Sequence, residues 1–426
     1  MKVRRLTAII GGTIAATVGI AFLVMNLSLG DKQVDWRTQH LYAVDDPQFV
    51  RTMSVMLGPP LTGGNRVEAL LNGDRIFPAM LAAIRSAKET VTFETYIYWS
   101  GSIGKDFADA LAERARAGVR VHVLVDWVGS SKLDAALLEE MAAAGVELRR
   151  YNKPKWYTMG RVNNRTHRKL LVVDGRVGFT GGVGIADKWL GDAGDPEHWR
   201  DTHFRIEGPA VAHLQAAFLD NWTKATGDVL HGTPYFPPLE PSGPVAAQMF
   251  ISSPGGGAES MQLMYLLSIG AATRSIRLSM SYFVPDDVAI ASFVDALKRG
   301  VKVQLILPGE HIDTAVVRRA SRATWGKLLR AGAEIYEYQP TMFHCKVMIV
   351  DDLWVSVGST NFDNRSFAVN DEANLNVYDR AFARAQSAVF DADLERSRRI
   401  SLEQWENRPW REKLAEHTSG LLSSQL

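Results

Sequence analysis

Two hydrophobic periods alternate along this chain, and their order occurs twice. Apolar residues recur at every second position in short β-branched runs, which predicts strands, and at every third or fourth position in longer Ala-rich stretches, which predicts helices. The sequence from 76 to 151 and the sequence from 260 to 338 both follow this alternation. It predicts an α/β fold with two similar halves, each a mixed sheet flanked by helices.

Glycines mark the ends of the predicted helices. Gly118 and Gly145 follow helical stretches in the first half, and Gly300 and Gly332 do so in the second, as is typical of glycine just beyond a helix C-terminus. The predicted helices span residues 76–87, 105–116, 133–144, 211–224, 260–272, 288–299 and 315–330. The predicted strands span residues 90–99, 119–126, 146–151, 275–283, 301–307 and 333–338.

A proline-rich stretch separates the two repeats. Five prolines fall between residues 233 and 244, a composition typical of linkers. We therefore place the first α/β half at 57–228, the linker at 229–246, and the second half with a C-terminal helical tail at 247–426. Two similar halves often pack with pseudo-twofold symmetry, which would bring equivalent strands of both to one central cleft.

The N-terminus differs from the rest of the chain. Residues 2–5 are basic, and residues 6–30 carry no charge. A helix of that length spans roughly 37 Å, enough to cross a hydrocarbon core of about 30 Å. We favour an uncleaved single-pass anchor at 1–30 over a signal peptide, followed by a polar connector at 31–57. The positive-inside rule then predicts a plasma (inner) membrane protein with its catalytic bulk on the periplasmic side.

Composition narrows the function classes only slightly. A chain of 426 residues is long enough for two core-bearing units. The net charge of +1 gives no global signal for nucleic acid, so any basic surface is local. Cys345 is the single cysteine, so no internal disulfide forms. We expect it to be a small buried hydrophobic residue that points away from its neighbours His344 and Lys346.

A histidine, a lysine and an aspartate occur at the same spacing in each half. They are His167, Lys169 and Asp174 in the first half, and His344, Lys346 and Asp351 in the second. Residues two apart on a strand point to one face, so each histidine stands beside its lysine. A lone motif of this kind is usually a surface strand followed by a hairpin turn. Two copies in register on a repeat are poorly explained by coincidence.

Two histidines and two lysines in one cleft would form an electropositive pocket for a phosphodiester. One neutral histidine can attack phosphorus and form a phosphohistidine, and we take His167 for this role. The other histidine can protonate the leaving alcohol and then deprotonate the incoming one. The lysines would bind the non-bridging oxygens as charge develops on them. The chemistry requires no metal or cofactor, and no cluster has metal-ligand spacing.

Other polar residues around the motifs extend the candidate site. Ser359 and Asn361 lie in a predicted tight turn that could add hydrogen-bond donors. Asp174 and Asp351 are candidates for chemistry or, equally, for structural hydrogen bonding.

The paired motif, with the second copy continuing as Gly-Ser-x-Asn-x-Asp-x-Arg-Ser from Gly358, resembles the phospholipase D superfamily. Several stretches resemble bacterial cardiolipin synthases in particular. They are Gly64-Asn65, Leu70-Leu71-Asn72-Gly73, Glu94-Thr95-Tyr96-Ile97, Trp199-Arg200-Asp201, Arg399 to Trp405, and Arg408-Pro409. The resemblance covers residues 57–426. It implies transfer of a phosphatidyl group from one phosphatidylglycerol to another, with release of glycerol.

The resemblance also implies supporting residues and shows two departures. Ser359, Asn361 and Glu372 fall where the family has its supporting polar residues, and we add Glu94 to this substrate-binding group. In the first half, Gly182 and Gly184 stand where the family has serine or glycine and asparagine, and the glycine at 184 removes a side-chain donor there. Many family members carry two membrane helices, whereas this sequence predicts one.

A basic stretch suits an anionic lipid surface. Residues 149–169 hold many lysines and arginines, no acidic residue, and the aromatic residues Trp156 and Tyr157. This combination is typical of membrane interfaces. A nucleic-acid surface and a solvated loop are the alternatives. The predicted helix at 315–330 is also basic, but its apolar face is expected to be core.

Three functions remain open from the sequence. The first is a membrane-bound phosphatidyltransferase that acts on anionic phospholipid. The second is a hydrolase of the same superfamily, acting on lipid or nucleic acid, in which water is the acceptor. The third is a non-catalytic lipid-binding scaffold, which the intact histidine and lysine pairs disfavour.

Overall fold

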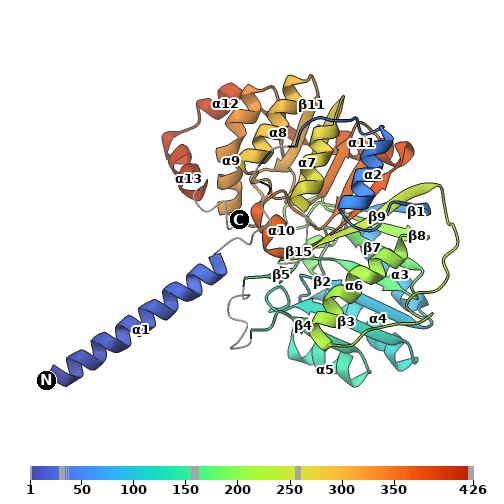
Figure 1. Cartoon of the computed structure of the whole chain (residues 1–426). Helices are drawn as coiled ribbons and strands as arrows, with labels where there is room; N and C mark the ends of the chain where they lie inside the picture. Colours follow the sequence, from blue (N-terminus) through green and yellow to red (C-terminus); the bar gives the residue numbers. More distant parts are fainter. Residues whose placement is uncertain are drawn as a thin grey trace.

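The computed structural model describes residues 2–27, 34, 36, 38–154, 163–254 and 261–420. Its main body is a mixed sheet of 16 strands with helices packed on its faces. Figure 1 shows the first half, in cyan to green, beside the second half, in yellow to red. The predicted α/β class is therefore confirmed.

The first half contains the elements from β1 to α6. Its strands are β1 (Thr62–Leu71), β2 (Thr90–Thr95), β3 (Arg120–Asp126), β4 (Glu147–Tyr151), β5 (Arg165–Thr166), β6 (Leu170–Val173), β7 (Val177–Gly181) and β8 (Thr202–Glu207). Its helices are α3 (Asn72–Ser86), α4 (Ser102–Arg116), α5 (Ala135–Ala143) and α6 (Val211–Thr226), with a 3-10 turn, η2 (Asp187–Trp189).

The second half contains the elements from β9 onward. Its strands are β9 (Val245–Ser252), β10 (Ser275–Met280), β11 (Lys302–Pro308), β12 (Glu334–Tyr338), β13 (Lys346–Val350), β14 (Trp354–Gly358), β15 (Asn370–Tyr378) and β16 (Ser397–Ile400). Its helices are α7 (Met261–Ala271), α8 (Asp287–Lys298), α9 (Ala315–Arg330), α10 (Asn364–Ala368), α11 (Arg380–Glu395), α12 (Leu402–Glu406) and α13 (Trp410–Gly420).

The strand order is the same in both halves when it is followed outward from the centre. One direction runs β1-β8-β7-β6-β2-β3-β4, and the other runs β9-β15-β14-β13-β10-β11-β12. The halves join where β1 pairs antiparallel with β9, at Thr62 with Ala247 and Asn65 with Val245. This order places β6 and β13, the strands that follow the two histidines, at equivalent positions.

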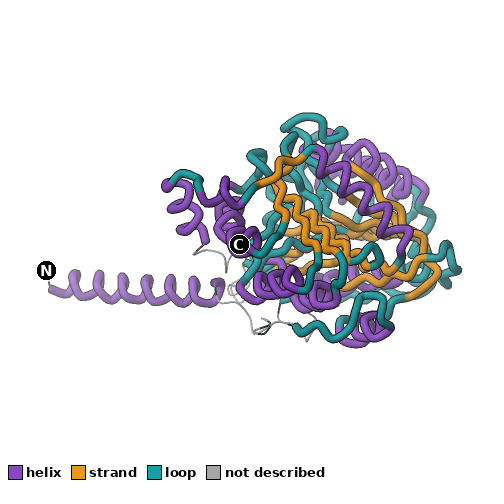
Figure 2. The backbone as a smooth tube through the Cα atoms, turned by 90° about the horizontal axis from the view of Figure 1, so that it is seen from above, coloured by secondary structure: helices purple, strands orange, loops and turns teal. Residues whose placement is uncertain are grey.

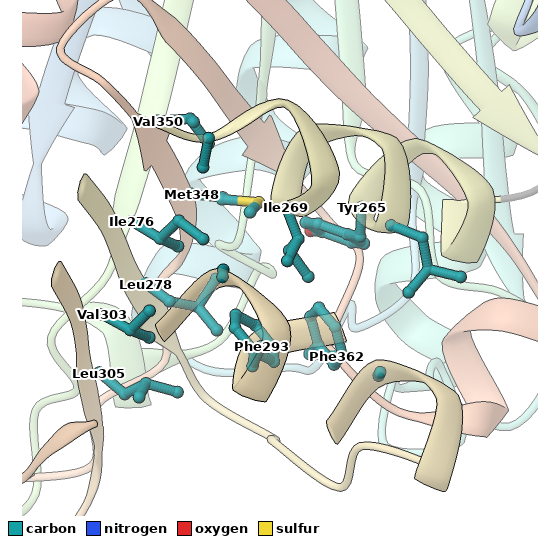
Figure 3. Packing of buried hydrophobic residues seen from close by; sticks show 14 of the residues in the cluster. Tyr265, Ile269, Ile276, Leu278, Phe293, Val303, Leu305, Met348, Val350 and Phe362 are labelled. Atoms are coloured by element: carbon teal, nitrogen blue, oxygen red, sulfur yellow. The ribbon is translucent and has the colours of Figure 1, made fainter. Parts of the chain in front are cut away.

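Three large hydrophobic clusters pack around the sheet. One lies within the first half, and one lies within the second half between the sheet and α7 and α8, as Figure 3 shows for Ile269, Ile276, Phe293 and Met348. The third draws Leu170 and Phe204 from the first half and Phe343 and Val347 from the second. The halves therefore share a core.

The N-terminal connector is more ordered than its polar composition predicts. Its residues include helix α2 (Pro47–Met56), capped by the Asp46 carboxylate, which accepts a 2.8 Å hydrogen bond from the Gln48 backbone N–H. Phe49 and Met53 of α2 are fully buried in the core of the second half. The stretch after it is strand β1, which connects the two halves of the sheet.

Helix α1 (Lys2–Leu27) extends away from the main body in two perpendicular views (Figures 1 and 2). It exposes apolar side chains, including Ile9, Ile14 and Val18. Across the part of the chain that the structure describes, no helix combines the length and apolarity needed to cross a bilayer. The predicted single-pass anchor is therefore unsupported.

Candidate active site

The two histidines lie directly before equivalent strands, and the opposite half fixes the backbone of each. The His167 N–H donates to the Asp371 carbonyl at 2.9 Å, which continues the parallel pairing of β5 with β15. The His344 N–H donates to the Arg200 carbonyl at 2.7 Å, beside a bridge between Arg200 and Phe343. Each motif is thus held by main-chain bonds across the junction of the halves.

A carboxylate from the opposite half also orients each imidazole ring. Nδ1 of His167 lies 3.0 Å from Oε1 of Glu372, at the start of β15. Nδ1 of His344 lies 2.7 Å from Oδ2 of Asp201, just before β8. Because β8 and β15 are equivalent strands, the two pairs are reciprocal: each half supplies the carboxylate for the histidine of the other. A ring that binds a carboxylate through Nδ1 keeps Nε2 available for substrate.

Each lysine is folded against its own histidine. Nζ of Lys169 donates to the His167 carbonyl at 2.6 Å. Nζ of Lys346 donates to the His344 carbonyl at 2.8 Å and to Oγ of Ser281 at 2.7 Å. Both ammonium groups are buried, so their positive charge is poorly screened by water.

Burial also sets the protonation of these groups. It lowers the pKa of His167 to about 4, helped by Lys169 and opposed by Glu372. It lowers the pKa of Lys169 to about 7 and lowers the pKa of Lys346 in the same direction. His344 also has a lowered pKa, through burial and then through Lys346. In the absence of an anion, both histidines are therefore neutral near pH 7.

For Glu372 and Asp201, neighbouring groups outweigh the effect of burial on the pKa. Burial alone would raise the pKa of Glu372, but His167, Lys169 and Ser359 lower it overall. Burial would likewise raise the pKa of Asp201, but His344 and Lys346 lower it. Both carboxylates therefore remain ionised beside neutral histidines, ready to stabilise an imidazolium when one forms.

His167, Lys169 and His344 line one pocket with a volume of about 510 Å³. Residues of both halves line it: Tyr96, Ile97, Trp99, Lys132, Arg165, His167, Lys169, Lys188, Trp189, Trp199, Tyr282, Asp313, Thr314, Val317, His344, Asn361, Asp363, Arg365, Ser366 and Asn370. The chemistry-bearing histidines, 177 positions apart in the sequence, thus face the same space.

Asn361 lines the pocket, whereas Ser359 does not, and each has a defined hydrogen-bond partner. Oγ of Ser359 donates to Oε2 of Glu372 at 2.5 Å. Oδ1 of Asn361 accepts from Oγ of Ser281 at 2.6 Å, and Ser281 in turn binds Lys346. Glu372 contacts His167 rather than the open pocket, so the structure places it behind the histidine.

Steric crowding explains why the first half has glycine at position 182. A Cβ on Gly182 would come within 2.2 Å of Oδ1 of Asp201. Asp201 instead receives a hydrogen bond from Trp189, whose Nε1 donates to its Oδ2 at 2.9 Å. An indole therefore does for Asp201 what the Ser359 hydroxyl does for Glu372.

Asp174 and Asp351 do not line the pocket. The Asp174 carboxylate accepts from the backbone N–H groups of Lys88, Glu89 and Thr90, at the start of β2. The Asp351 carboxylate accepts in the same way from residues 273–275, before β10. Each aspartate has a left-handed backbone, with φ of 51° and 53°. The structure therefore gives both aspartates a role in strand geometry, at the far ends of β6 and β13 from the histidines.

Glu94 is also separate from the pocket. Its Oε1 accepts from Oγ1 of Thr166 at 2.5 Å and from Nδ2 of Asn221 at 2.8 Å. Burial raises its pKa to about 7. We predicted a substrate contact, but the side chain lies behind the residue before His167, where it supports β5.

The comparison with protein families decides the assignment. A family model described as "Cardiolipin synthase, PLD-like domain" matches residues 80–222 and 265–394. The chain belongs to this family. The resemblance to the phospholipase D superfamily is thereby confirmed, and the chain is an enzyme of the phosphatidyltransferase class within it.

Named relatives agree over most of the chain. A cardiolipin synthase A of Pseudomonas putida (strain GB-1) is 35% identical over 376 residues, covering 86% of this chain and 77% of its own length. A cardiolipin synthase of Geobacillus kaustophilus (strain HTA426) is 36% identical over 370 residues, covering 86% and 74%.

Solved structures share the fold. A phosphatidylserine synthase of Haemophilus influenzae Rd KW20 superposes with a TM-score of 0.67 at 12% identity, covering 90% of this chain and 100% of its own. A polyphosphate kinase of Porphyromonas gingivalis gives a TM-score of 0.55 at 12% identity, covering 91% and 56%.

Asp201 is the site residue of this family member that sequence reasoning missed. It stands within a stretch that carries the resemblance, Trp199-Arg200-Asp201, but no role followed from that. Its partner His344 lies 143 positions away. The repeat could have identified Asp201, because it precedes β8 as Glu372 lies near the start of the equivalent strand β15.

Two other predictions have mixed outcomes. Cys345 is buried and points away from the pocket, with Sγ 3.8 Å from the Arg200 carbonyl, as expected. The central part of the basic stretch, residues 155–162, lies outside the described residues.

Proposed function

We propose that this chain is a cardiolipin synthase-type phosphatidyltransferase, which transfers a phosphatidyl group between two phosphatidylglycerol molecules and releases glycerol. One observation carries the proposal: two histidines, each with its own buried lysine and a carboxylate from the opposite half, line one pocket. This arrangement fits a phosphodiester held between a nucleophile and a general acid.

In the first step, Nε2 of His167 attacks phosphorus, and the bond from phosphorus to the glycerol oxygen breaks. His344, protonated once an anionic phosphodiester lies beside it, gives its proton to that oxygen. Glu372 stabilises the positive charge that develops on the ring of His167, as the buried carboxylate does in a catalytic triad. Lys169 and Lys346 bind the non-bridging oxygens.

In the second step, the direction reverses. Neutral His344 takes the proton from a hydroxyl of the second phosphatidylglycerol, whose oxygen attacks phosphorus. The bond from phosphorus to Nε2 of His167 breaks, and the histidine is restored. The two carboxylates alternate in stabilising an imidazolium, which suits their reciprocal placement.

Membrane association follows from the proposed substrates, which are anionic phospholipids. The exposed apolar residues of α1 supply one surface for contact with lipid. We propose that the enzyme works at the plasma (inner) membrane, with the periplasmic side as the expected location of the pocket.

The test is a product assay. Purified protein is incubated with phosphatidylglycerol vesicles in the presence of a chelator, and lipids and glycerol are followed by mass spectrometry. Cardiolipin with an equal amount of glycerol is the expected result. Phosphatidic acid alone would make water the acceptor and the enzyme a phospholipase. His167→Ala and His344→Ala are each expected to abolish turnover, and substantial activity in either would contradict the two-histidine mechanism.

A further inference from the structure

Two arginines from opposite halves line the pocket on the side of His167. Arg165 belongs to β5, and Arg365 belongs to α10. The Arg365 guanidinium reaches across to the first half, where it donates to the Asn163 side chain at 3.1 Å and to the Asn163 carbonyl at 3.0 Å. These are neutral partners. Among the described residues, no carboxylate forms a salt bridge with Arg365, although its side chain is largely buried in the pocket wall.

Two guanidinium groups close together in a pocket wall repel each other. Burial and then the neighbouring Arg165 lower the pKa of Arg365, while Tyr96, Asp363 and Asp126 act in the opposite direction. Both arginines also act on the Tyr96 hydroxyl, whose ring lies 5.2 Å from the ring of His167. The cationic pair is therefore next to the reacting centre. A bound anion between the guanidiniums would remove their repulsion and accept paired hydrogen bonds from both.

The spacing from the histidine fits a second phosphate. Arg165 and His167 are two residues apart along one extended segment, and both line the pocket. Side chains at this separation stand roughly 7 Å apart on one face. A phosphate bound at Arg165 would therefore lie about one such spacing from a phosphate held at His167. The three-carbon glycerol of phosphatidylglycerol can bridge such a gap between two phosphates.

Asn370 supplies a polar group between these positions. It lies opposite Arg165 in the pairing of β5 with β15, lines the pocket and is 5% exposed. Its Nδ2 lies 3.4 Å from Oε1 of Glu372, while its buried Oδ1 has no hydrogen-bond partner among the described residues. A hydroxyl of a bridging glycerol could donate to this oxygen.

We propose that Arg165, Arg365 and Asn370 form an acceptor subsite that binds the phosphodiester and glycerol of the second phosphatidylglycerol. The inference rests on the proposed function and specifies what distinguishes a lipid acceptor from water or a small alcohol. The subsite holds the acceptor by its own phosphate, so that its terminal hydroxyl is positioned to attack phosphorus while His344 takes the proton.

The experiment separates donor cleavage from acceptor use. Phosphatidylglycerol vesicles are mixed with isotopically labelled glycerol. Labelled phosphatidylglycerol reports cleavage of the donor and transfer to a neutral alcohol, and cardiolipin reports transfer to the phosphate-bearing acceptor. Arg165→Gln and Arg365→Gln are expected to lower cardiolipin formation roughly 10- to 100-fold relative to glycerol exchange, the range for losing a charged hydrogen-bond partner. Arg365→Lys, which keeps the charge, should lose less.

Lys105→Gln is the control, because Lys105 is a cation outside the pocket that pairs with Asp109 at 2.8 Å. Its ratio of cardiolipin to exchange should equal that of the wild type. Exchange and cardiolipin that fall together in the arginine variants, or a ratio that does not change, would overturn the acceptor subsite while leaving the transferase intact. A wild-type enzyme that makes only phosphatidic acid would overturn both proposals.

Discussion

The reciprocal carboxylates Glu372 and Asp201 give the two histidines their chemical direction. Each accepts from Nδ1, which leaves Nε2 of each ring free of the carboxylate, and both histidines line the pocket. The surrounding groups differ. Ser359 supports Glu372, whereas Trp189 supports Asp201 and packs 5.3 Å from the ring of His344. The site is thus built twice from the same plan with different residues.

Glu372→Gln tests whether this carboxylate stabilises the imidazolium. The amide keeps the shape of the side chain but removes the charge, so kcat is expected to fall roughly 10²- to 10⁴-fold, with a small change in KM. Glu94→Gln is the control. Like Glu372, Glu94 is a buried glutamate. It lies in the first half and contacts Thr166 and Asn221 outside the pocket. We expect its activity to stay within about tenfold of wild type. A larger loss in Glu94→Gln than in Glu372→Gln would reverse the assignment.

The pH dependence follows from Lys169. Burial lowers its pKa to about 7, and only the ammonium form attracts the phosphate. Above this pH the free enzyme loses the charge, so kcat/KM is expected to fall. Protonation of His167, with its pKa of about 4, limits the acid side. In Lys169→Arg the guanidinium stays protonated, and the alkaline fall should move to higher pH. An alkaline limb that does not move would exclude Lys169 as its cause.

At the scale of the elements, the strand ends were the least predictable from sequence. Regular periods gave the alternating strands and helices of each half, including the positions of His167 and His344. The spacing of apolar residues did not show which strands pair with one another. Strands β8 and β15 were not predicted, although they carry or directly follow the carboxylates that orient both histidines. Their pairing is set by contacts between distant segments, and local patterning does not encode it.

The same limit explains the aspartates. A motif shows only the spacing of its residues. The strand between histidine and aspartate, β6 or β13, carries the aspartate to the opposite end of the sheet. Glu94 was misplaced for a related reason. Residues two apart on a strand point to the same face, so Glu94 and Tyr96 would share a face if the strand continued. Strand β2 ends at Thr95, however, and of these two residues Tyr96 lines the pocket and Glu94 does not.

Asp351→Ala tests the role of the strand-end aspartates. The substitution removes an acceptor for the backbone N–H groups of Thr273, Arg274 and Ser275, and it places alanine in a left-handed conformation. We expect a loss of about 2–4 kcal/mol in the free energy of unfolding. The kcat of the folded enzyme should remain within a few-fold of wild type.

Asp352→Ala is the control for this measurement. Asp352 has the same backbone conformation, but its carboxylate accepts one bond, from Ser387. A smaller loss of stability is expected. A stable Asp351→Ala protein without activity would show instead that Asp351 takes part in the chemistry.

At the scale of the whole molecule, the site exists only because the halves share one sheet and one core. The third hydrophobic cluster contains residues from both halves. Buried Arg168 adds bonds from the first motif to the Ala217 carbonyl, to Asp220 and to Ser253 of the second half. Arg200 forms a bidentate pair with Asp393 across the same junction, at 2.9 and 2.8 Å.

These shared contacts predict that the two halves unfold together. Calorimetry of the full-length protein in detergent should show one cooperative transition for the main body, because neither half buries its core alone. Two resolved transitions, with loss of activity at the lower one, would show instead that each half is a stable unit.

We propose that one histidine of this shared pocket carries the phosphatidyl group between two lipids. The most direct test quenches the enzyme with phosphatidylglycerol under alkaline denaturing conditions, where phosphohistidine survives, and maps the adduct by peptide mass spectrometry. We expect a phosphatidyl group on His167 in the wild type and no adduct in His167→Ala. An adduct on His344, or turnover without any covalent adduct, would contradict this mechanism.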